Sequence, residues 1–142
     1  MTKFALLLRL ANDRLEAAAE RMRKAQQAQQ HAQQMLLQLD SFIADYQQSM
    51  LAQGQAGMSV LQWQDYRLFM QKLDDAREQQ QQEVERAAQR FLVEKQAWLL
   101  ERRKLKSYEV LQKSEEKRTA LSQKRREQKT LDQFSARLKK PD

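Results

Sequence analysis

Apolar residues recur through the first half of the chain with alternating spacings of three and four. The pattern runs from Leu8 to Met50, and Gln29 is its one polar member. Its positions are Leu8, Ala11, Leu15, Ala18, Met22, Ala25, Gln29, Ala32, Leu36, Leu39, Ile43, Tyr46 and Met50. A 3-4 repeat kept for about six heptads predicts a helix that packs along a coiled-coil seam. The alanines let a partner helix approach closely, whereas the seam is bulky from Leu36 onward.

A second pattern with the same spacing runs from Trp63 to Tyr108. Its positions are Trp63, Tyr66, Met70, Leu73, Arg77, Gln80, Val84, Ala87, Phe91, Glu94, Trp98, Glu101, Leu105 and Tyr108. The stripe then thins to Leu111, Leu121, Leu131, Phe134 and Leu138, and no helix breaker occurs before Pro141. The pattern predicts a second helix over about 60–138.

Both glycines of the chain, Gly54 and Gly57, lie between the two patterns. Glycine favours the left-handed conformation that ends many helices, and Ser59 with Gln62 has the spacing of a capping box. We therefore expect the first helix to span about 3–52 and a turn to span 53–59. A short connection between long helices favours an antiparallel hairpin.

The predicted fold is all-α: one coiled-coil domain over 1–142, a long two-helix antiparallel hairpin whose second helix is the longer. Folding at the turn sets Phe4 opposite Tyr108 and leaves an overhang over about 109–142. The composition agrees, because Gly 2 and Pro 1 are too few for the turns of a β-rich domain. Cys 0 excludes disulfides and thiolate chemistry. We expect neither a signal peptide nor a transmembrane helix.

No catalytic constellation is visible, and the sequence predicts a protein that is not an enzyme and holds no metal or cofactor. His31 is the only histidine and falls outside the seam. The neighbouring carboxylates Asp74–Asp75 and Glu115–Glu116 point in different directions on a helix, so they do not converge on one substrate atom.

The formal net charge of +7 is concentrated at one end of the chain. Residues 102–142 hold fourteen Lys/Arg and six Asp/Glu, a net of +8. The cluster within the overhang consists of Lys117, Arg118, Lys124, Arg125, Arg126 and Lys129. Such a strip suits an acidic protein partner, a solvated surface or non-specific nucleic-acid binding. No leucine zipper follows the basic segment and no aromatic residues are interleaved with it, which argues against nucleic acid. An acidic protein partner is favoured, and a solvated surface stays open.

A second stripe, with spacings of four, three and four, leaves the seam after the turn. It consists of Phe69, Leu73, Ala76 and Gln80, and it shares Leu73 with the seam. Two interpretations remain open: Phe69 broadens the core of the hairpin, or the stripe is a helix-face docking site.

Three segments together resemble the FliJ family of the flagellar type III export apparatus. They are Phe4–Ala11, which is similar to the start of the family, Trp63–Leu73, which is similar to its W-x-x-Y-x-x-F-x-x-x-L segment, and Arg126–Arg137, which is similar to its C-terminal E/D-Q-K-x-L/M-D-E-F-A-x-R segment. Gln133 and Ser135 depart from the Glu and Ala of the family pattern. The resemblance covers the whole chain, and it depends on the order and spacing of the three segments together.

The resemblance implies an antiparallel coiled coil similar to the central stalk of rotary ATPases. It implies a cytoplasmic protein, peripheral at the inner-membrane export apparatus, with a part in flagellum biogenesis, motility and chemotaxis. It implies three partners: the export ATPase hexamer, the cytoplasmic domain of the export gate, and export chaperones. The gate face is Phe69, Leu73, Ala76 and Gln80. The ATPase-binding end combines the basic cluster with Leu131 and Phe134. Three alternatives stay open: the stalk of a virulence-type secretion system, a nucleic-acid-binding coiled coil, and a structural spacer.

Overall fold

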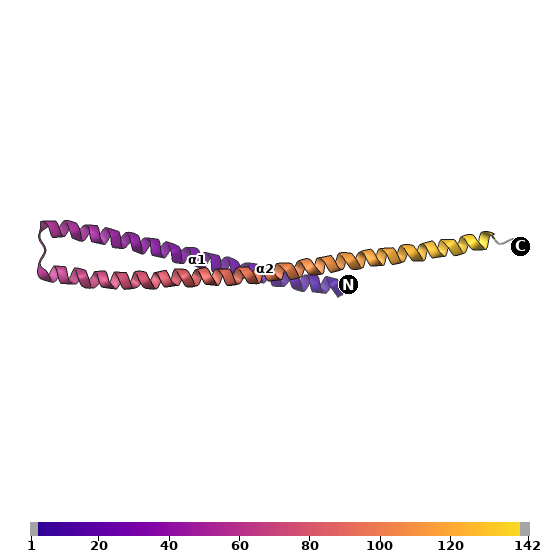
Figure 1. Cartoon of the computed structure of the whole chain (residues 1–142), viewed down its shortest axis with the longest axis horizontal. Helices are drawn as coiled ribbons and strands as arrows, with labels where there is room; N and C mark the ends of the chain where they lie inside the picture. Colours follow the sequence, from indigo (N-terminus) through magenta and orange to yellow (C-terminus); the bar gives the residue numbers. More distant parts are fainter. Residues whose placement is uncertain (1–2, 140–142) are drawn as a thin grey trace. The chain divides into compact units, whose positions relative to one another are not determined.

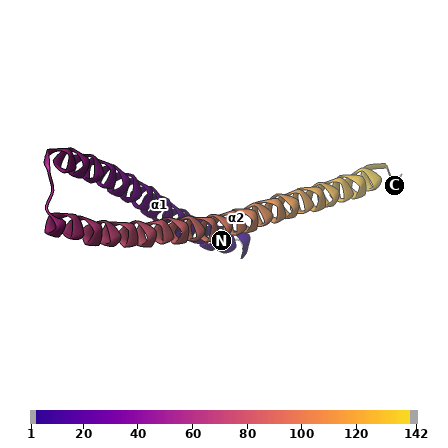
Figure 2. The same cartoon turned by 60° about the vertical axis from the view of Figure 1, so that its left-hand side comes forward.

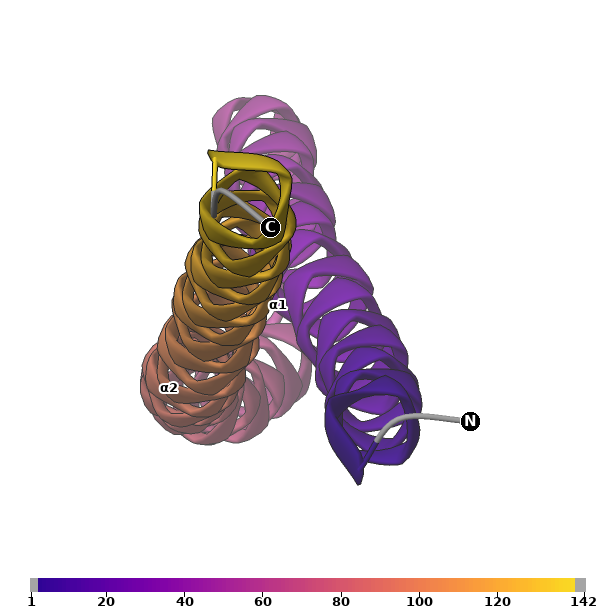
Figure 3. The ribbon, with the colours of Figure 1, turned by 90° about the vertical axis from the view of Figure 1, so that its right-hand side faces the viewer.

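The computed structural model describes residues 3–139, and these form two helices, α1 (Lys3–Ala56) and α2 (Val60–Lys139). Figures 1 and 3 show only these two elements. Contacts divide the chain into two compact units, Ala17–Trp98, and Met1–Glu16 together with Leu99–Asp142. Within the first unit α1 and α2 run side by side in opposite directions. The all-α hairpin with a longer second helix is confirmed.

The connection between the helices is shorter than the sequence predicted, because α1 continues past residue 52 to Ala56. Gly54 stays helical, and only Gly57 takes a positive φ, of 106°. The N–H of Gly57 donates to the carbonyl of Gly54 at 3.3 Å. Gly57 is therefore the residue that ends α1, since a side chain there would strain the left-handed backbone.

The start of α2 is fixed by the predicted capping box. The N–H of Ser59 donates to Oε1 of Gln62 at 3.0 Å, and the N–H of Gln62 donates to Oγ of Ser59 at 3.2 Å. The first helical bond follows, from the N–H of Trp63 to the carbonyl of Ser59. Two backbone N–H groups that a helix start leaves unpaired are thus satisfied.

Small residues form the tightest part of the hairpin core. Ala18 is completely buried, and Ala25, Ala32, Leu73 and Ala87 are also buried. Alanines on the seam let two helices approach more closely than larger residues do. Toward the connection the seam carries rings, and Tyr46 stacks on Tyr66 with centroids 5.7 Å apart. Figures 1 and 2 show α1 and α2 moving apart in this direction, as the size of the side chains requires.

Two positions of the predicted seam on α2 are not in the core. Trp63 is 52% exposed, although its ring lies 5.5 Å from that of Tyr66. Arg77 is also exposed and reaches across to Asp40 of α1. The physical reasons differ: the helices have separated at Trp63, whereas a guanidinium leaves the apolar seam to keep its charge in water.

In the second unit Ala11 of α1 is buried, and the half-buried residues of α1 are Phe4, Ala5, Leu7, Leu8 and Leu15. Phe4 shares a hollow with the Gln112–Gln123 part of α2. From Lys113 to Lys139 every residue of α2 is exposed, and in Figures 1 and 2 the α1 part of this unit does not reach the end of this stretch. The predicted overhang is therefore exposed from Lys113 onward, although Phe4 still lines a hollow with it as far as Gln123. Its last residues, 140–142, lie outside the described residues.

Candidate functional site

The stripe predicted for docking on α2 is only partly accessible. Phe69 is 38% exposed and Ala76 is exposed, but Leu73 is buried. Gln80 is half-buried, and its Nε2 donates to the backbone carbonyl of Ala32 on α1 at 3.0 Å. Leu73 and Gln80 therefore hold the hairpin together, and Phe69 and Ala76 are the members that offer surface.

An aromatic cluster surrounds Phe69. The ring of Tyr46 on α1 meets that of Phe69 edge to face, with centroids 4.8 Å apart, and also stacks on Phe42 at 6.3 Å. Such pairs contribute about 0.5–1.5 kcal/mol beyond the area they bury. Tyr46 thus fixes the orientation of Phe69, and rings from both helices contribute to this part of the surface.

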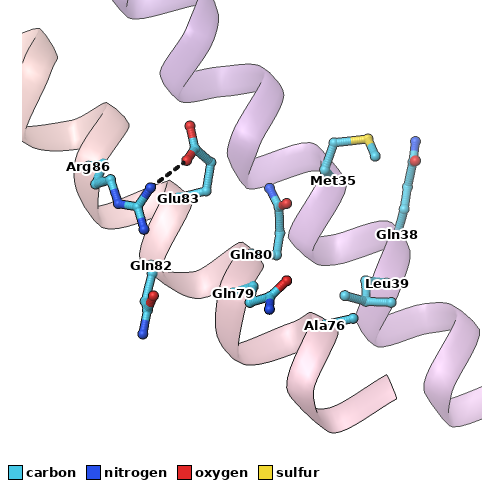
Figure 4. A pocket seen from close by; sticks show the side chains of 9 residues that line it. All are labelled: Met35, Gln38, Leu39, Ala76, Gln79, Gln80, Gln82, Glu83 and Arg86. Atoms are coloured by element: carbon cyan, nitrogen blue, oxygen red, sulfur yellow. Dashed lines mark ion pairs between the residues drawn. The ribbon is translucent and has the colours of Figure 1, made fainter. Parts of the chain in front are cut away.

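A groove of about 820 Å³ follows the stripe away from the connection. Figure 4 shows its lining: Met35, Gln38 and Leu39 from α1, and Ala76, Gln79, Gln80, Gln82, Glu83 and Arg86 from α2. The side chains of Leu39 and Ala76 point toward one another across it. The rim carries amides and one ion pair, Glu83 with Arg86 at 3.6 Å. Sequence reasoning on α2 alone missed the α1 wall of this groove.

Charged side chains connect α1 and α2 at two levels of the first unit. Nε and Nη2 of Arg77 both donate to the carboxylate of Asp40. This hydrogen bond, together with the charge of Asp40, raises the pKa of Arg77. Farther along, Nε of Arg21 lies 3.3 Å from Oε2 of Glu94. These cross-helix pairs specify the antiparallel register, as polar groups at coiled-coil seams do.

The predicted basic end lies wholly on the solvated stretch of α2. All six of its Lys and Arg are exposed, and Arg118 lies 4.0 Å from Glu115 one turn earlier. Leu131 is 59% exposed and Phe134 is 60% exposed. These apolar side chains stand among the exposed lysines and arginines of the same stretch.

The candidate residues for chemistry stay apart. His31 is exposed, as are Asp74–Asp75 and Glu115–Glu116. Within residues 3–139, no group of three or more His, Asp or Glu side chains is placed to hold a metal ion. Neither α1 nor α2, over the same residues, contains a stretch apolar enough to cross a membrane.

Comparisons with known proteins match this chain over nearly its whole length. The family model described as "Flagellar FliJ protein" matches residues 1–140. The chain belongs to the flagellar FliJ family. A "Flagellar FliJ protein" of Escherichia coli (strain K12) is 26% identical over 140 residues, covering 97% of this chain and 95% of the relative. One of Salmonella typhi is 24% identical over 135 residues, covering 94% and 92%. Membership of the FliJ family supports a role as a component of flagellar export, as the resemblance implied.

Proposed function

We propose that this chain is a non-enzymatic stalk of the flagellar type III export apparatus. Its basic end enters the hexameric export ATPase, promotes assembly and turnover of the ring, and couples the ring to the export gate. The chain acts on the cytoplasmic side of the inner membrane and also handles export chaperones. The observation that carries this proposal is the α2 stretch from Lys113 to Lys139, which is helical, basic, apolar at intervals and exposed throughout.

The mechanism requires only differential binding. A ligand shifts an equilibrium by as much as it prefers one state over another. Leu131 and Phe134 supply apolar contact, and the neighbouring lysines and arginines supply charge for an acidic lining. If the assembled ring binds this stretch more tightly than separate subunits do, the stalk raises the population of active ring. The chain itself makes or breaks no bond.

The test is the ATP hydrolysis rate of the purified export ATPase with and without the full chain. We expect stimulation by the full chain and no stimulation when residues 117–142 are deleted. Leu131→Ala with Phe134→Ala in one variant is expected to remove most of the effect. Leu37→Ala is the matched control, because Leu37 is exposed on α1 far along the chain from the overhang. An unchanged rate after deletion of 117–142 contradicts the stalk.

The gate-facing surface is proposed for the stripe Phe69, Leu73, Ala76 and Gln80, with Phe69 and Ala76 as its accessible members. We expect Phe69→Ala to weaken binding of the gate's cytoplasmic domain about tenfold, the loss typical of a central aromatic anchor. The control is Leu68→Ala, because Leu68 is the preceding residue on α2 and is 60% exposed. Leu73→Ala is not a clean test, since Leu73 is buried in the hairpin.

The basic overhang also suits nucleic acid, which binds positive strips without sequence specificity through counterion release. A filter-binding assay at about 0.15 M salt distinguishes nucleic-acid binding from the proposed stalk function. Tight DNA or RNA binding at that salt, together with an unstimulated ATPase, would replace the stalk with a nucleic-acid-binding function.

A further inference from the structure

Two glutamates occupy the same seam position of α2, one heptad apart, and only one of them is fully paired. Glu94 accepts from Nε of Arg21 on α1 and from Nε of Arg90 on its own helix, each at 3.3 Å. Among the described residues, Glu101 has an ion pair with Lys104, whose Nζ lies 3.8 Å from Oε1. Its other oxygen, Oε2, is buried and accepts no hydrogen bond from those residues. A buried carboxylate oxygen without a donor destabilises the packing around it.

Arg14 of α1 is the cation that the heptad repeat assigns to Glu101. Arg14 precedes Arg21 by seven residues, and Glu101 follows Glu94 by seven residues. Two antiparallel helices that pair along a seam repeat their cross-helix contacts at this interval. Arg14 is exposed, and its guanidinium pairs with no side chain within residues 3–139. An unused donor and an unused acceptor therefore occupy equivalent positions on the two helices.

A contact within the second unit gives the same register. Phe4 of α1 and Gln112 of α2 line one hollow. Arg14 lies ten residues after Phe4, and Glu101 lies eleven residues before Gln112. Both intervals are about three turns of helix, so the two residues advance together along the seam. The register of this unit therefore brings Arg14 beside Glu101.

Packing between the helices is sparse around this unmade pair. Among residues 4–16 of α1 only Ala11 is buried, and no residue of α2 from Leu99 to Gln112 is buried. Leu6 is 55% exposed and Leu10 is 44% exposed, although both belong to the apolar start of α1. Segments with few buried apolar contacts open locally at a small cost in free energy. This end of α1 is therefore the part of the paired helices that separates most easily.

We propose that residues 4–16 of α1, here called the strap, open from α2 and that an ion pair between Arg14 and Glu101 holds them closed. In the closed strap, Oε2 of Glu101 gains a charged donor. In the open strap, water solvates both charged groups. The exposed stretch of α2 then extends from near Leu99 instead of from Lys113. The strap is a property of the free chain, so it stands or falls independently of the proposed ATPase binding.

The test is hydrogen–deuterium exchange of the full chain, followed by mass spectrometry of peptides from the strap. A detached helix end of this length is marginal in water, so its amides exchange when the strap opens. Glu101→Leu is expected to slow strap exchange about tenfold, because an apolar side chain replaces a buried carboxylate that lacks a donor. Glu109→Leu is the matched control, since Glu109 is an exposed carboxylate on the same helix. It should leave the exchange rate unchanged.

The ion pair is tested from the side of α1. Arg14→Gln is expected to speed strap exchange about threefold, the loss typical of one partly exposed ion pair. The same substitution added to Glu101→Gln should have no further effect, because the pair is already lost. Arg9→Gln is the control, since it removes an equal charge from another exposed position of the strap. The effect of Arg14→Gln should shrink at about 1 M salt.

Each part of the proposal has a result that overturns it. Exchange that is unchanged or faster in Glu101→Leu overturns Glu101 as the weak point of the seam. Equal rates in Arg14→Gln and Arg9→Gln, or an effect of Arg14→Gln that persists beside Glu101→Gln, overturn the ion pair. Strap peptides that exchange as slowly as peptides from Ala18–Ala32 overturn the opening itself. Circular dichroism of each variant verifies that its helix content matches the wild type.

Discussion

Arg77 of α2 donates two hydrogen bonds to the carboxylate of Asp40 on α1, at a position where the heptad pattern expects an apolar residue. The pair lies between the buried Leu73 and the half-buried Gln80. Gln80 also crosses to α1, where it donates to the carbonyl of Ala32. Two adjacent turns of α2 thus carry polar contacts that are satisfied in one register of the hairpin and lost in others.

Arg77→Gln is expected to lower the thermal midpoint of the hairpin slightly, because an exposed ion pair contributes little. The difference from the wild type should shrink at about 1 M salt, which screens the pair. Arg86→Gln is the control, since Arg86 pairs with Glu83 on its own helix and holds no register. A salt-independent loss for Arg77→Gln would mean that packing of the Arg stem, rather than its charge, stabilises the hairpin.

Ala18→Leu is expected to destabilise the hairpin by about 1–3 kcal/mol, because extra methyl groups overpack a close helix contact. Ala18 is completely buried against the facing helix. Ala17→Leu is the control: Ala17 is exposed, so its change in unfolding free energy should stay within about 0.5 kcal/mol. The measurement is chemical denaturation followed by circular dichroism. Equal effects at the two positions would contradict the close approach at Ala18.

Much of the fold follows from periodicity alone. The a/d repeat identified the buried alanines, and the Ser59–Gln62 spacing identified the cap. Periodicity does not report how far apart the helices lie at each turn, so the exposure of Trp63 and the outward turn of Arg77 could not be predicted. It also treats one helix at a time. The α1 wall of the groove beside Ala76 depends on which face of α1 meets α2. Only the three-dimensional structure shows that face, for example through the contact of Tyr46 with Phe69.

The two glycines are expected to respond oppositely to the same substitution. Gly54→Ala should stabilise the chain by up to about 1 kcal/mol, because Gly54 is helical with open space around it. Gly57→Ala should destabilise it by about 1 kcal/mol, because a side chain at a φ of 106° is strained. Thermal unfolding of both variants checks this. Stabilisation by both would contradict Gly57 as the residue that ends α1.

Limited trypsin digestion is expected to remove the overhang before it cuts the hairpin. A helix without a packing partner is marginal in water and frays from its free end. The cleavage sites include Lys113, Lys117, Arg118 and Lys124, all in the fully exposed stretch. In Ala17–Trp98, exposed Lys and Arg lie on helices that pack against each other along the seam, so this fragment should persist in a time course followed by mass spectrometry.

Adding the export ATPase should slow cleavage in the overhang and leave the rate within the hairpin unchanged, because the proposed ring covers only the former. Bovine serum albumin at the same concentration controls for competition by added protein. Cleavage at equal rates in Ala17–Trp98 and the overhang of the free chain would contradict an unpartnered helix end. Overhang cleavage that the ATPase does not slow would contradict its binding there, because a covered helix cannot unfold locally to enter the protease.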